Sequence, residues 1–155
     1  MDSTLQTLTG QHRAVQRRVR GISDAVARGD TTTLEAALRG LYADLLEHLR
    51  LEDAQLYPEL VRLAQLGGRE DLVTLAESFA SSMVTITLAL TRFLEHQLAR
   101  PPQIELFREP WERTARMLSA RIVMEETSLY PLYARLAATA DRVEAKPTAV
   151  RPELR

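Results

Sequence analysis

The segment HLRLEDAQLYP, which spans residues 48–58, aligns without gaps to RIVMEETSLYP at residues 121–131. Both copies end in two acids, two variable residues and Leu-Tyr-Pro, but the copies differ at their first position, where Arg121 replaces His48. Residues four apart lie on one face of a helix, so His48 and Glu52 are able to reach one metal ion. Arginine has no lone pair to offer a metal. The first copy therefore has the pattern of a metal-binding segment, and the second copy has the same pattern with its histidine replaced by arginine.

Four long segments with helical periodicity contain these copies. Apolar residues recur every three or four positions from about residue 3 to 28, from 32 to 66, from 70 to 98 and from 104 to 138. Short connections rich in glycine or proline separate the segments, and strand patterns are absent. Because short loops between long amphipathic helices imply antiparallel neighbours, the sequence predicts an all-α, up-down-up-down four-helix bundle over residues 1–140.

Finer features of the helices follow from capping residues and prolines. Thr32, with Glu35 three residues later, is expected to open the second helix, and Pro58 is expected to kink that helix or end its first part. Residues 141–155 are polar, contain two prolines and lack periodicity, so we expect them to be disordered. The inward residues of the third helix are expected to be Leu72, Leu75, Phe79, Met83, Ile86, Leu90 and Phe93.

Composition excludes several classes of function. The 155 residues carry a net charge of -1, so no overall field attracts nucleic acid or an anionic membrane, and there is no cysteine for thiolate chemistry. The one basic concentration is expected to lie on the outer face of the first helix. No secretory signal is present and no apolar run approaches the ~18 residues of a membrane span, which predicts a cytoplasmic protein without a membrane partner. The basic residues are Arg13, Arg17, Arg18 and Arg20.

Five polar residues interrupt the apolar seams of the helices. Sixteen positions separate His12 from the end of its helix near residue 28, and sixteen separate the start of the next helix near residue 32 from His48. The two histidines should therefore lie at one level, and the repeat adds residues from the fourth helix. Two imidazoles and two carboxylates suit iron, manganese or zinc. The predicted layer consists of His12, His48, Glu52, Arg121 and Glu125.

These motifs resemble the hemerythrin-like, histidine-histidine-glutamate cation-binding domains over roughly residues 3 to 138. The resemblance rests on Gln11-His12 and on the two repeat copies. It implies two non-haem irons bridged by carboxylates, each with histidines from two helices. The implied ligands of the first iron are all present: His12, His48, Glu52 and Glu125.

The resemblance also implies that the second iron site is incomplete. Its fourth-helix histidine is Arg121, and its third-helix histidine should fall around residues 77–86, where Ser78 or Phe79 stands. Glu77 lies off the seam. We therefore expect at most one non-haem iron or other divalent metal, with the Arg121 guanidinium placed where a second cation would be and bonded to both carboxylates.

Three functions remain open from the sequence. The leading hypothesis is a one-metal protein that binds or senses a small ligand such as dioxygen, nitric oxide or peroxide, the ligand class being implied by the resemblance. The second is a metal-free interaction module in which Arg121 replaces the cation. The third is an enzyme that uses the layer as an acid–base or mononuclear metal pocket. Tyr57 and Tyr130 are expected to cap the core, with a possible second role as hydrogen-bond donors to the carboxylates. His96 is expected to be exposed.

Overall fold

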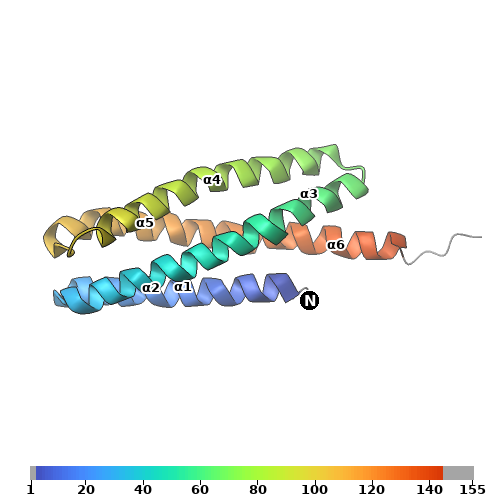
Figure 1. The fold of residues 1–155 in the computed structure, drawn as a ribbon. Helices are drawn as coiled ribbons and strands as arrows, with labels where there is room; N and C mark the ends of the chain where they lie inside the picture. Colours follow the sequence, from blue (N-terminus) through green and yellow to red (C-terminus); the bar gives the residue numbers. More distant parts are fainter. Residues whose placement is uncertain (1–2, 145–155) are drawn as a thin grey trace, which may run out of the picture.

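The computed structural model describes residues 3–144, which form four antiparallel helical rods without a strand in that range (Figure 1). The predicted all-α bundle is thereby confirmed. Two of the rods are interrupted by short π-helical turns, η1 and η2. In chain order the elements are α1 (Ser3–Arg28), α2 (Thr31–Leu51), η1 (Glu52–Leu56), α3 (Tyr57–Leu66), α4 (Glu70–Leu98), α5 (Ile104–Met124), η2 (Glu125–Leu129) and α6 (Tyr130–Glu144).

The second rod changes from α-helical to π-helical winding just before Pro58. In η1 the backbone N–H of Tyr57 donates to the carbonyl of Glu52, five residues back. Pro58 follows directly; it has no N–H to donate and its ring crowds the preceding turn, and a wider turn relieves the crowding. The predicted end of the α-helical part is thus found at Leu51, but the rod continues through η1 into α3.

The fourth rod contains the same kind of π-helical turn. The Tyr130 N–H donates to the carbonyl of Glu125 in η2, and Pro131 follows. Neither π-helical turn was predicted from the sequence. Each one begins at the glutamate of its repeat copy, so the local widening sets the direction in which these two carboxylates enter the bundle. Inserted π-helical turns of this kind are frequent at functional sites.

Two helix boundaries differ from the sequence predictions. The second helix is capped by Asp30, whose side chain accepts from the Thr33 N–H at 3.0 Å, rather than by Thr32. Gly29, with φ of 67°, makes the preceding turn in the left-handed region that glycine favours. At the other end of the chain, α6 continues to Glu144, which moves the predicted boundary at 140 outward. The remainder of the predicted disordered tail, residues 145–155, lies outside the described residues.

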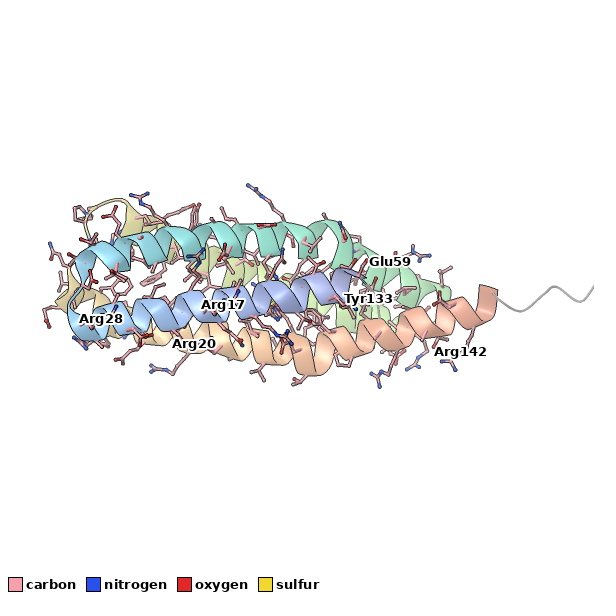
Figure 2. The ribbon with its side chains drawn as sticks, turned by 90° about the horizontal axis from the view of Figure 1, so that it is seen from below. Arg17, Arg20, Arg28, Glu59, Tyr133 and Arg142 are labelled. Atoms are coloured by element: carbon pink, nitrogen blue, oxygen red, sulfur yellow. The ribbon has the colours of Figure 1, made fainter. Side chains whose placement is uncertain are left out.

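A polar layer divides the hydrophobic core in two. One apolar cluster lies toward the α1–α2 turn and includes Trp111, and the other lies toward the α3–α4 turn and includes Leu60. The polar layer lies between the two clusters and comes from the first, second and fourth rods. Its residues are at most 3% exposed: His12, His48, Glu52, Arg121 and Glu125. The arginines of α1, among them Arg17 and Arg20, are exposed on the outside of the bundle as predicted (Figure 2).

Helix α4 is the least covered of the rods. Its buried residues are Ala76, Met83, Leu90 and Leu94. Leu75, predicted to face the core, is 43% exposed. An 18-residue window of α4 has a mean hydropathy of 1.5, so contrary to expectation one helix is long and apolar enough to cross a membrane by length and composition. Only 11% of this stretch is buried in the bundle.

Candidate metal centre

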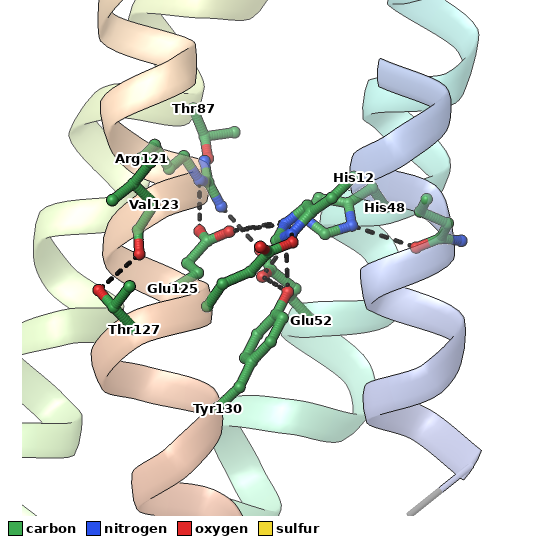
Figure 3. Close-up of polar contacts among 11 residues, drawn as sticks. His12, His48, Glu52, Thr87, Arg121, Val123, Glu125, Thr127 and Tyr130 are labelled. Atoms are coloured by element: carbon green, nitrogen blue, oxygen red, sulfur yellow. Dashed lines mark hydrogen bonds and ion pairs between the residues drawn. The ribbon is translucent and has the colours of Figure 1, made fainter. Parts of the chain in front are cut away.

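Four side chains from three rods converge in the polar layer (Figure 3). His12 comes from α1, His48 from the end of α2, and the two glutamates from the first positions of η1 and η2. One donor atom from each lies within 4.8 Å of the others. The seam argument therefore placed all four residues correctly, while their role as metal ligands stays a prediction. The four are His12, His48, Glu52 and Glu125.

The inner nitrogens of both imidazoles face carboxylate oxygens. Nε2 of His12 lies 3.0 Å from Oε2 of Glu125. Nε2 of His48 lies 3.4 Å from Oε1 of Glu52 and 3.9 Å from Oε2 of Glu125. Two nitrogens and two oxygens thus surround one point, with no more than 2% of any of these residues exposed.

The outer nitrogens of the same rings face hydrogen-bond acceptors. Nδ1 of His12 lies 2.8 Å from Oε1 of Glu126, and Nδ1 of His48 lies 3.1 Å from Oε1 of Gln11. An Nδ1–H that donates to these oxygens leaves each Nε2 lone pair directed at the carboxylates. Lone pairs that face each other repel, so a proton or a metal ion belongs between them. Orientation of a histidine by an outer carboxylate or amide is the usual arrangement in metal sites.

Arg121 bonds to the other oxygens of the same two carboxylates. Its Nε donates to Oε1 of Glu125 at 2.6 Å and its Nη2 donates to Oε2 of Glu52 at 2.7 Å. Its Nη1 donates to Oγ1 of Thr87 at 3.0 Å. Each glutamate therefore has one oxygen toward the histidines and one toward the guanidinium. The predicted bonds from Arg121 to both carboxylates are thus present, while its role as the substitute for a second cation stays a prediction.

Charges within the layer shift one another's pKa values. Burial would raise the pKa of Glu125, but bonds from His12, His48 and Arg121 outweigh it and lower that pKa well below its usual range. Burial would likewise lower the pKa of His48, but contacts with Glu125 and Glu52 raise it to about 9. In the absence of a metal, His48 is thus protonated at neutral pH, and its proton supplies the cation between imidazole and carboxylate.

Thr87 is the residue that α4 contributes to the layer. The sequence placed this position at Ser78 or Phe79, and both expectations are wrong. Ser78 is exposed, and Phe79 packs against the apolar cluster that lies toward the α3–α4 turn. Thr87 lies one residue beyond the predicted window. The signal that locates it is the spacing of the buried residues Met83 and Leu90, between which Thr87 falls on the same face.

The two tyrosines of the repeat behave differently. The Tyr130 hydroxyl lies 3.2 Å from Nε2 of His12 and donates to Oε1 of Glu52 at 3.4 Å. The Tyr57 hydroxyl is the single buried side-chain polar atom without a partner among residues 3–142. Burial, together with the charges of Glu52 and Glu125, raises the pKa values of both phenols. An orphaned hydroxyl close to these carboxylates fits a layer that accepts a further polar group.

A surface groove lies beside two residues that contact His12. It has a volume of about 340 Å³ and is bordered by Glu126, which bonds to His12, and by Tyr130. The complete lining is Leu5, Thr9, Glu126, Tyr130, Pro131 and Ala134. No other histidine joins the site within the described residues, because His96 is exposed near the far end of α4, as predicted. Glu77 is exposed as well.

Comparison with known families supports this geometry. The family model of the hemerythrin HHE cation binding domain matches residues 3–133. The chain belongs to the hemerythrin HHE cation-binding domain family. No curated protein and no solved structure matches it. The matched range of this HHE domain includes both repeat copies and all four candidate ligands, so the buried His/His/Glu/Glu group lies within a domain whose family binds cations.

Proposed function

We propose that the protein binds a single non-haem iron, or another divalent metal, and presents it to a small ligand such as dioxygen, nitric oxide or peroxide. The observation that carries the proposal is the division of carboxylate oxygens: Oε2 of Glu125 and Oε1 of Glu52 face the histidines, while their partner oxygens are bonded to Arg121. A metal would lie between the histidines and the two oxygens that face them, and the guanidinium would remain on the other side of the carboxylates.

Charge balance supports one metal rather than two. A divalent ion and Arg121 together bring three positive charges. They would be matched by the carboxylates of Glu52, Glu125 and Glu126, the last of which bonds to the outer nitrogen of His12. A second divalent ion beside the guanidinium would have no further carboxylate in this layer, and buried charges without partners are costly.

The residues would divide the work as follows. His12, His48, Glu52 and Glu125 would hold the metal, and Gln11 and Glu126 would orient the two imidazoles. A bound iron would supply an open coordination position and one-electron redox chemistry. Reversible two-electron dioxygen binding needs two irons and is not favoured here. A small ligand would approach from the groove beside Glu126 and Tyr130, and the Tyr57 hydroxyl, which has no partner in the described residues, would donate a hydrogen bond to it.

Metal analysis of the purified protein tests the proposal. The chain is incubated without oxygen with Fe²⁺, Mn²⁺ or Zn²⁺, excess ion is removed, and metal per chain is measured by mass spectrometry. We expect about one metal per chain. His48→Gln should lose it, whereas the matched control His96→Gln, at an exposed histidine, should retain it. Nitric oxide added to the Fe²⁺ form should produce a new visible absorption band that His48→Gln lacks.

Metal per chain also tests the alternative that the protein is a metal-free bundle. That alternative is favoured by the guanidinium bridge to both carboxylates, because Arg121 together with protonated His48 balances their two negative charges without a metal. If no metal is retained from any of the three ions while circular dichroism shows a folded bundle, the one-metal proposal is wrong and the protein is a metal-free bundle.

A further inference from the structure

An uncharged strip of surface covers the middle of α4 on its solvent side. The fourteen residues from Ser78 to Thr91 contain no charged side chain. Within them, Val84 is 58% exposed and Leu88 is 47% exposed. In Figure 1 α4 forms the upper edge of the bundle, and no other element lies beyond it. Two large apolar side chains one helical turn apart, on a helix that the bundle covers on one side only, mark a surface that another molecule can cover.

Charged residues stand at the two ends of this strip. Glu77, Ser81, Val84, Leu88 and Arg92 are all exposed, and their spacing of three or four residues places them within an arc of about 80° on the helix. We call these five residues the α4 stripe. Its ends carry opposite charges, and neither Glu77 nor Arg92 has an ion pair or hydrogen bond within the described part of the chain.

We propose that the α4 stripe is the interface of a two-fold symmetric dimer with a second copy of this chain. In an antiparallel pair whose axis passes between Val84 and Thr85, Glu77 of each copy lies opposite Arg92 of the other, because both are equally far from the axis. The same register sets Ser81 opposite Leu88, so a small side chain faces a large one. Two ion pairs then flank an apolar centre.

The charge order selects this partner and this direction. A parallel pair would set Glu77 against Glu77 and Arg92 against Arg92, which is repulsive at both ends. A membrane is a poorer partner, because only fourteen residues separate the two charges, fewer than the ~20 that a span requires. The stripe also contains Ser81, which suits close approach of two helices.

The area of contact limits the strength of the dimer. A single helix pair with two partly exposed apolar residues per copy is smaller than a standard protein interface, so the dimer should be weak, with a dissociation constant on the order of 10–100 µM. The interface lies on the outer side of α4, away from the polar layer. The proposal therefore does not depend on whether a metal is bound.

Charge reversal tests the register. Sedimentation velocity is run from about 5 to about 500 µM, a range that brackets the expected constant. Glu77→Arg and Arg92→Glu should each weaken the dimer about tenfold or more, because each creates two like-charge pairs. The double variant Glu77→Arg/Arg92→Glu restores both attractions and should return to the dissociation constant of the parent. Equimolar mixing of the two single variants should also restore dimers, since each then supplies the charge that the other lacks.

Control variants separate this effect from general charge effects. Glu112→Arg changes the same charge at an exposed position of α5 and should dimerise like the parent. Val84→Gln and Leu88→Gln should weaken the dimer without lowering the melting temperature. A parent that stays monomeric over the whole range, or single reversals without effect, would overturn the proposal. Flotation with neutral phosphatidylcholine vesicles that depends on Val84 and Leu88 would also overturn it, in favour of a membrane surface.

Discussion

The two copies of the repeat share their backbone and differ in the cation they provide. Both η1 and η2 begin at a glutamate, and both are followed by a tyrosine and a proline. One turn earlier stands His48 in the first copy and Arg121 in the second. Histidine directs to the shared carboxylates a ring nitrogen that carries a proton or, once deprotonated, a lone pair, while arginine directs fixed N–H groups to them. The same helical frame thus builds an adaptable cation position on one side and a permanent cation on the other.

Removal of the Arg121 guanidinium, the permanent cation of the layer, should produce the largest loss of stability. Arg121→Ala leaves Glu52 and Glu125 buried without their shared partner, so the metal-free protein should lose about 3–5 kcal/mol of its free energy of unfolding. Denaturant titration measures the loss. Arg116→Ala, at an exposed position on the same helix, is the control and should change little. An unchanged free energy of unfolding in Arg121→Ala would end the idea that arginine replaces a cation.

Conversion of the second copy into the first should raise the metal content. Arg121→His removes the guanidinium but restores only one ligand, so it should bind a second metal weakly. Adding Thr87→His places a histidine at the α4 position that contacts Arg121, and the double variant should hold close to two metals per chain. Ser78→His in place of Thr87→His is the control, because Ser78 is exposed. Equal metal content in both double variants would refute the assignment of Thr87.

Titration of His48 should make the stability of the metal-free protein depend on pH. The pKa of His48 is raised from 6.5 to about 9 in the folded state. Its stabilising contribution is therefore complete below about 6.5 and is lost as the pH rises through about 9, a decline on the order of 2–3 kcal/mol. Denaturant titrations of the metal-free protein between these pH values measure the decline. His48→Gln should abolish it and His96→Gln should not; a decline of equal size in His48→Gln would assign it to another group.

The smallest expected difference is that between the two tyrosines. Tyr57→Phe removes a buried hydroxyl without a partner and should leave the stability of the metal-free protein unchanged or raise it by about 1 kcal/mol. Tyr130→Phe removes a hydroxyl that contacts His12 and Glu52, and should lower stability by about 1 kcal/mol. Thermal melts of the two variants side by side provide the comparison. Equal losses in both would show that Tyr57 has a partner in solution.

Periodicity and the repeat were sufficient to predict the bundle and its polar layer. His12 and His48 were placed at one level by counting residues to the turn, which works because a helix rises by a constant amount per residue. Arg121 was placed by alignment of the two copies. The same reasoning failed on α4, where the apolar pattern is almost continuous and therefore does not define one inward face, so that Leu75 was assigned to the core and Thr87 was missed.

The sequence by itself indicated the family through the motifs of the two repeat copies. It also determined the four rods and the residues of the layer, because these depend on spacing along single helices. The tertiary structure alone decided which atoms meet. The assignment of one oxygen of each glutamate to Arg121 and the other to the histidines depends on three rods at once, and the contact between His12 and Glu126 depends on two. The π-helical turns were likewise seen only in the structure, because the apolar periodicity of a helix does not reveal one added residue in a single turn, although each turn begins at the glutamate of its repeat copy and precedes a proline.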